Sequence, residues 1–111
     1  MSISFDEFRT RLKSLELPVF RDKAAEGTPY PYYVYSFSTE KRIMGSSRTA
    51  LVVTEYRVSL FTTGTERELI PFKKEFSREQ YESFTGVPGD ENDDTVTNFT
   101  TFIDVVARGW R

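Results

Sequence analysis

The chain has 111 residues, which is enough for one domain but too few for two self-sufficient cores, so a single domain over residues 1–111 is expected. Its formal net charge of −2 excludes the class of proteins that coat nucleic acids, because such proteins are usually strongly basic. The absence of cysteine excludes disulfides, thiolate nucleophiles and sulfur-ligated metals, and the absence of histidine removes the commonest general base and metal ligand.

An amphipathic helix is predicted near the start of the chain. Ser4 and Glu7 have the spacing of a capping box, and Pro18 is expected to end the helix near Leu17. Spacings of three and four place on one face the apolar residues Phe5, Phe8, Leu12 and Leu15. The first residues lack the basic start and apolar run of a signal peptide, and no membrane span is predicted, so the cytosol is the expected compartment.

A strand with two apolar faces is predicted at residues 32–37, after a short edge strand at Val19 and Phe20 and a polar loop. Its alternate residues form two faces, one with Tyr33, Tyr35 and Phe37 and the other with Tyr32, Val34 and Ser36. A sheet with helices on one side and a neighbouring subunit on the other explains why both faces are apolar.

Residues 38–53 are predicted to form a long, partly mobile hairpin loop, because their first half is polar and contains a glycine. The second arm of this hairpin is expected to begin near Ala50 and to run to Thr62. Period-two alternation turns Tyr56, Val58 and Leu60 one way and Glu55, Arg57 and Ser59 the other. The predicted inter-subunit face of the sheet contains Tyr32, Val34, Arg57 and Phe61.

A second helix is predicted after Thr65, which begins another capping box. Its apolar face contains Leu69, Phe72 and Phe76. Pro71 removes one helical hydrogen bond, so we expect either a kink there or a helix that begins at this residue. Residues 81–84 either extend the helix or begin a strand. Residues 86–94 are predicted to be an exposed acidic loop, and residues 96–106 a closing strand with Phe99, Ile103 and Val105 on one face.

The predicted fold class is therefore α+β: a single domain in which an antiparallel β-sheet with a long hairpin loop carries two main α-helices on one face.

No catalytic, metal or cofactor site is predicted. The available carboxylates occur where surface charges or helix caps are expected, at Glu55, Glu66, Glu68, Glu75 and Glu79. Asp90, Asn92 and Asp94 alternate as in a calcium-binding EF-hand loop, but Thr95 and Thr101 occupy the positions that require glycine and glutamate. Neither bound calcium nor an enzymatic activity is expected.

Two further patterns concern partners. A stacking platform for single-stranded nucleic acid is one interpretation of Tyr30, Tyr32, Tyr33 and Tyr35, which Lys41 and Arg42 follow. Core packing explains the same alternation of aromatic residues. The acidic overall charge favours core packing over nucleic-acid binding. The charge also differs between the halves of the chain. Residues 1–50 contain eight basic and six acidic residues, whereas residues 51–111 contain seven and eleven. This asymmetry suits head-to-tail association of identical subunits.

Several short strings, together with the order of elements, resemble the tail terminator, or tail completion, proteins of long-tailed bacteriophages. The strings are Leu17-Pro18-Val19-Phe20, Thr28-Pro29-Tyr30-Pro31-Tyr32-Tyr33-Val34-Tyr35 and Tyr56-Arg57-Val58-Ser59-Leu60-Phe61-Thr62-Thr63, the last running into the helix at residues 66–76. With the amphipathic first helix, they make the resemblance cover most of the chain.

The resemblance implies a non-enzymatic structural protein without cofactors, located in the tail or neck of the virion and in the host cytoplasm during assembly. Proteins of this family form rings, typically hexamers, that cap the tail tube and then present a surface to the head connector. It further implies that the loop at residues 38–53 projects toward the channel or an adjoining ring, where Lys41, Arg42 and Arg48 line a path crossed by DNA. Three alternatives remain: a head-closure or connector-plug protein, a small nucleic-acid-binding phage protein, and an enzyme.

Overall fold

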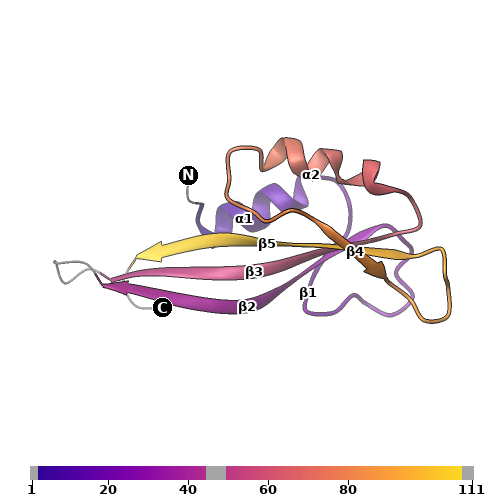
Figure 1. Ribbon diagram of the computed structural model, residues 1–111, viewed down its shortest axis with the longest axis horizontal. Coiled ribbons are helices and arrows are strands. Elements are labelled where there is room, and N and C mark those ends of the chain that lie inside the picture. Colours follow the sequence, from indigo (N-terminus) through magenta and orange to yellow (C-terminus); the bar gives the residue numbers. More distant parts are fainter. Residues whose placement is uncertain (1–2, 45–49, 109–111) are drawn as a thin grey trace.

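The computed structural model describes residues 3–44 and 50–108. In chain order its elements are α1 (Phe5–Lys13), β1 (Val19–Arg21), β2 (Tyr32–Met44), β3 (Ala50–Thr62), the 3₁₀ helix η1 (Glu66–Leu69), α2 (Ile70–Glu75), β4 (Thr85–Pro88) and β5 (Thr97–Arg108). The five strands form one sheet in the order β1-β2-β3-β5-β4. Both α-helices lie on the same face of this sheet (Figure 1).

This architecture confirms the α+β class and the placement of two helices on one face. The sheet is antiparallel except at one edge, where β1 runs parallel to β2 and pairs Val19 with Tyr33. The register of the β2–β3 hairpin joins Tyr33 to Leu60 and Tyr35 to Val58, so these residues share one face of the sheet, as their alternation predicted.

The N-terminal capping box is present in α1. The backbone N–H of Glu7 donates to Ser4 Oγ at 3.1 Å, and the backbone N–H of Ser4 donates to Glu7 Oε1 at 3.3 Å. The helix ends at Lys13, earlier than the expected end near Leu17. The physical reason is a turn in which Glu16 adopts a left-handed backbone with φ 66°, so the chain has already left helical geometry before it reaches Pro18.

The expected loop at residues 38–53 is largely strand, which corrects the sequence interpretation. β2 continues to Met44 and β3 begins at Ala50, with Met44 opposite Ala50 in the register. A strand that projects into solvent needs no apolar face, so the polar residues 38–42 gave no period-two signal. Lys41 and Arg42 therefore lie on a strand, whereas Arg48 lies outside the described residues.

The second half of the chain resolves two open questions. Pro71 is in the first turn of α2, which begins at Ile70, so the proline stands at the start of the α-helix, where its missing N–H removes no helical hydrogen bond. Residues 81–84 do not extend the helix, because Tyr81 forms an isolated antiparallel bridge with Ile103 and the chain then enters β4. The prediction of a loop over residues 86–94 was wrong for its first three residues. Gly86, Val87 and Pro88 belong to β4, an edge strand, and proline is tolerated at the edge of a sheet.

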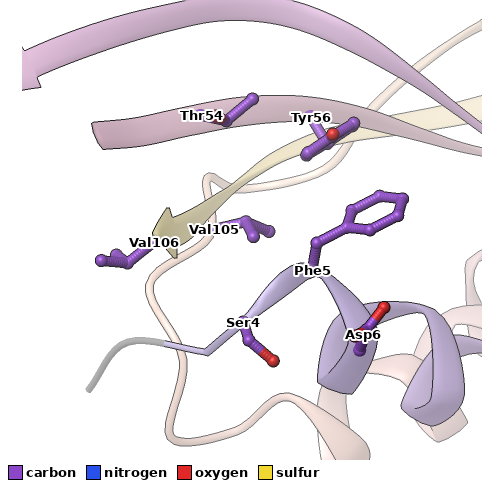
Figure 2. A pocket seen from close by; sticks show the side chains of 7 residues that line it. All are labelled: Ser4, Phe5, Asp6, Thr54, Tyr56, Val105 and Val106. Atoms are coloured by element: carbon purple, nitrogen blue, oxygen red, sulfur yellow. The ribbon is translucent and has the colours of Figure 1, made fainter. Parts of the chain in front are cut away.

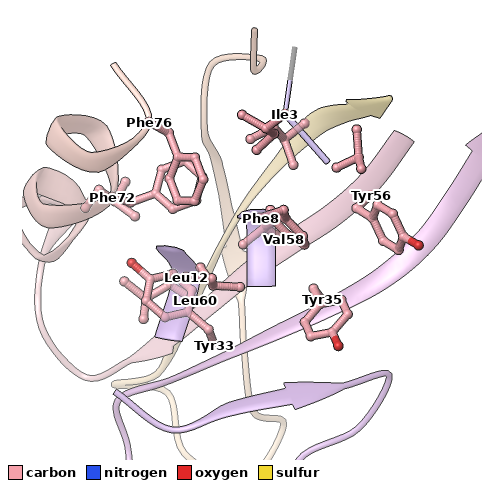
Figure 3. Packing of buried hydrophobic residues seen from close by; sticks show 13 residues of the cluster. Ile3, Phe8, Leu12, Tyr33, Tyr35, Tyr56, Val58, Leu60, Phe72 and Phe76 are labelled. Carbon is pink, nitrogen blue, oxygen red and sulfur yellow. The ribbon is translucent and has the colours of Figure 1, made fainter. Parts of the chain in front are cut away.

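The core lies between the helices and the sheet (Figure 3). Its buried members are Ile3, Phe8, Leu12, Tyr33, Tyr35, Tyr56, Val58, Leu60, Leu69, Phe72, Phe76, Ile103 and Val105. Phe8 of α1 meets Tyr35 edge to face at 5.6 Å between ring centroids and stacks on Tyr56 at 5.6 Å. These contacts use the aromatic residues of β2 and β3 that face the helices, so half of the aromatic strand is core.

Candidate interaction surface

The four residues predicted to form an inter-subunit face do lie on one side of the sheet. Tyr32 is opposite Phe61 in the hairpin register, and Arg57 is opposite Ser36, two residues along β2 from Val34. All four therefore share the face that carries no helix, because residues at even spacing along a strand point the same way. They are not equally accessible.

A loop covers part of this helix-free face. The segment between β1 and β2 forms one wall of a hollow of about 480 Å³, and the sheet forms the other with Tyr32, Val34 and Phe61. Val34 is consequently only 9% exposed in the single chain. Tyr32 and Phe61 are half-buried, whereas Arg57 is exposed. Only Arg57 among the four is fully available to a partner without movement of the loop.

A row of stacked aromatic rings fixes this covered region. Tyr30 stacks on Tyr32 at 5.4 Å between centroids, and Tyr32 stacks on Phe61 at 5.3 Å. Phe20 of β1 meets Tyr32 edge to face at 5.9 Å. Such pairs each stabilise by about 0.5–1.5 kcal/mol beyond the area they bury, so the row contributes to folding. The sequence pattern grouped Tyr30 with Tyr32, but it did not connect Phe20 with these rings.

Tyr30 also holds the acidic loop that follows β4. Its hydroxyl donates to Asp90 Oδ2 at 2.9 Å. This hydrogen bond, with burial and the nearby negative charge, raises the pKa of Tyr30 to about 12. Within the loop, Asp90 Oδ1 accepts the N–H of Asn92, and Asp93 Oδ1 accepts the N–H and hydroxyl of Thr95, which lowers the pKa of Asp93. Asp90 and Asp93 thus order their own turns.

The four tyrosines of the proposed nucleic-acid platform do not form one surface. Tyr33 and Tyr35 face the helices and are buried, whereas Tyr32 faces the opposite side and stacks with Tyr30. Burial also raises the pKa of Tyr33. Because the rings are divided between the two faces of the sheet, they cannot present consecutive stacking positions to one strand.

The candidate carboxylates are also dispersed. Glu75 and Glu79 both accept hydrogen bonds from Arg11, at 2.8 Å from Nε and 3.0 Å from Nη1. Glu55 accepts a hydrogen bond from Ser38 at 3.1 Å, and Glu66 and Glu68 are exposed in η1. In the part of the chain that the structure describes, no three His, Cys, Asp or Glu side chains are placed to hold a metal ion.

The end of the sheet that contains residues 39–44 of β2, 50–53 of β3 and 106–108 of β5 projects beyond the helices, and we call it the arm (Figure 1). β1 pairs with β2 only at Tyr33–Tyr35, so no other described strand lies along the outer edge of the arm. A bulge between Phe37 and Thr39 marks its root. Phe37 is 52% exposed and Ile43 is 40% exposed, although both are large apolar side chains.

The accessible apolar side chains of the arm were missed from the sequence. Phe37 has the alternation of a core residue and shares its face with Tyr35, but the helices do not reach it. Lys41 and Arg42 follow on the same strand, opposite Val53 and Val52, and are exposed. Neighbouring strand residues point to opposite faces, so these two cations are on opposite sides of the arm.

A hollow of about 270 Å³ lies where the arm meets the helices. Figure 2 shows Phe5 of α1 pointing toward Tyr56 of β3, with Val105 of β5 beside them. Ser4, Asp6, Thr54 and Val106 complete the wall. Burial raises the pKa of Tyr56, and Phe5, Tyr56 and Val105 give the hollow apolar walls that suit an apolar side chain.

No known protein-family model matches the chain, and no curated protein sequence is significantly similar to it. Neither α-helix of the described residues is long and apolar enough to span a bilayer.

Proposed function

We propose that the protein is a structural component of a bacteriophage or prophage that caps the tail tube as an oligomeric ring and joins the tail to the head. The observation that carries this proposal is the arm. Three strands extend past the helices, with Phe37 exposed at the root of the arm and Ile43 exposed on the arm itself, and a partner surface would cover these apolar side chains. The resemblance of the chain to tail terminator proteins supplies the biological setting.

The dispersion of ionisable side chains supports a non-enzymatic role. The carboxylates of Glu75 and Glu79 bind Arg11, and the carboxylate of Asp90 binds Tyr30, so each has a structural partner. Cofactors are not part of the proposed function. The proposed partners are further copies of the chain in a hexameric ring, the tail tube protein and the head connector, with DNA only in passage.

The direct test mixes the purified protein with the cognate tail tube protein and images the products by electron microscopy. We expect rings seated on tube ends and tubes of a defined final length. Tubes that keep growing, with no density at their ends, would contradict the proposal. Rings that bind the portal-proximal connector but ignore tube ends would instead identify a head-closure protein.

A second candidate is DNA binding by the monomer, favoured by the basic residues of the arm. Lys41 and Arg42 are exposed on it, next to a single acidic residue, Glu40. This function predicts binding to duplex DNA that weakens steeply as salt rises, because basic side chains release counterions from the phosphates. The capping function predicts no such binding by the free protein.

A further inference from the structure

Charge is separated along the longest dimension of the molecule, which measures 52 Å against 26 and 21 Å for the others. The arm forms one end, and the loop between β4 and β5 lies at the opposite end (Figure 1). Residues 86–98 contain the four acidic residues Asp90, Glu91, Asp93 and Asp94 and no basic residue. The described strands of the arm contain the basic residues Lys41, Arg42 and Arg108 and the acidic residue Glu40.

The acidic end is an ordered surface. Asp90 is fixed by the hydroxyl of Tyr30, and Asp93 is fixed by Thr95. Glu91 and Asp94 are exposed. Beside them Val87 of β4 is 51% exposed, so this end presents an apolar side chain next to its negative charge.

The arm presents the complementary combination. Lys41 and Arg42 are exposed, and Ile43 next to them is 40% exposed. The acidic end therefore has one exposed aliphatic side chain beside negative charges, and the arm has one beside two basic residues and a single acidic one, Glu40. The two ends cannot meet within one chain, because the length of the sheet separates them.

We propose that the arm of one copy binds the acidic β4–β5 end of the next copy. The occupant of the arm is thus a second copy of this chain, selected by complementary charge, with Ile43 and Val87 supplying apolar contact. Two different patches meet in such a contact, so it is head-to-tail and generates a closed ring when the rotation between copies closes. Ring closure at the tail tube rests on the proposed function, whereas the pairwise contact does not.

The contact is sensitive to ionic strength. Its charges are exposed, and the screening length falls from about 10 Å at 0.1 M salt to about 3 Å at 1 M. Complementary charge mainly speeds encounter and rejects wrong orientations, while the aliphatic contact adds free energy that salt does not remove. Both ends are required, so a change at either end breaks the same contact.

The test uses charge reversal at each end, measured by sedimentation velocity over a range of protein concentrations at about 0.1 M salt. Lys41→Glu with Arg42→Glu, and separately Glu91→Lys with Asp94→Lys, should each weaken self-association at least about tenfold, because like charges then face each other. The chain that carries all four changes should associate again, since its ends are complementary once more. Lys73→Glu with Lys74→Glu, on the exposed side of α2, is the matched control and should associate as the original chain does.

Thermal unfolding of every variant separates a lost contact from a lost fold. Carbodiimide coupling of a mixture of isotope-labelled and unlabelled chains provides a second measurement. It should join Lys41 of one copy to Glu91 or Asp94 of another, as identified by peptide mass spectrometry. The proposal would be overturned if the chain with all four charge reversals is folded but stays dissociated. It would also be overturned if the coupling never joins Lys41 to Glu91 or Asp94 of another copy.

Two other results have distinct meanings. If the original chain is monomeric at every concentration and Lys41→Glu with Arg42→Glu abolishes binding to a short DNA duplex, the arm is a DNA-binding surface and the contact is wrong. If rings form on tube ends but ignore charge reversal, the contact is wrong while the capping function stands. Salt-sensitive head-to-tail association without any binding to tail tubes would uphold the contact and remove the capping function.

Discussion

At the scale of single residues, Arg11 joins the two helices. It extends from α1 to the end of α2, where it donates to the carboxylates of Glu75 and Glu79 and to the backbone carbonyl of Glu75. Its guanidinium also lies 4.8 Å from the centroid of the Phe76 ring. Burial by itself lowers the pKa of Arg11, but the hydrogen bonds to the two carboxylates raise it above its ordinary value.

Replacing Arg11 with alanine should lower the free energy of unfolding by about 2 kcal/mol, since the Glu79 side chain, only 7% exposed, then loses its hydrogen bond to the guanidinium. Urea denaturation measures the change. Lys13→Ala, at an exposed position of the same helix, should alter stability by less than about 0.5 kcal/mol. Equal effects of the two substitutions would show that the ion pairs of Arg11 contribute nothing to the free energy of unfolding.

The hydrogen bond from Tyr30 to Asp90 predicts a pH-dependent contribution to stability. The pKa of Tyr30 is about 12 in the folded chain against an ordinary value of 10, so folding favours the protonated phenol. Its contribution is fully present below pH 10 and is lost as the pH rises toward 12. The difference in unfolding free energy between the original chain and Tyr30→Phe should shrink over that range in denaturation experiments. A constant difference from pH 8 to 12 would contradict this assignment, and Asp90→Ala should remove the same dependence.

At the scale of elements, β2 has two environments. Its first half is covered on one face by the helices and on the other by the loop between β1 and β2, whereas its second half forms the edge of the arm. Apolar residues in the two halves of the strand therefore have different roles. Val34 contributes to folding, while Phe37 and Ile43 are available for assembly.

Aspartate substitutions distinguish these environments. Val34→Asp should destabilise the protein by about 3 kcal/mol or more, because a carboxylate would be buried without a partner. Phe37→Asp, at a side chain that is 52% exposed, should change the unfolding free energy by less than about 1 kcal/mol and should instead impair ring formation. Unfolding by denaturant and electron microscopy of tube ends measure the two effects. Similar unfolding by both variants would assign the arm to the core.

At the scale of the whole molecule, length and charge separation act together. The molecule is 52 Å long and has net charges of opposite sign at its two ends, which favours association in one direction over side-by-side pairing. The bulge at the root of the arm and the charged residues after it disfavour unspecific pairing along the open edge of β2. The salt dependence of self-association and the charge-reversal variants test whether this charge separation directs the association of whole molecules.

The sequence by itself determined the elements whose signals are local. The capping box at Ser4 and the alternation of Tyr56 and Val58 depend on nearby residues, so they could be predicted. At Pro71 the local rules left two alternatives, a kink or a helix start, and the structure has the helix start. The shared face of Tyr32 and Phe61 followed from the same alternation. Only the tertiary structure decided which apolar side chains are covered, because coverage depends on how far the helices and the loop after β1 extend over the sheet. It turned the expected loop at residues 38–53 into an arm, buried Val34, exposed Phe37, and placed the acidic loop at the opposite end of the molecule from Lys41.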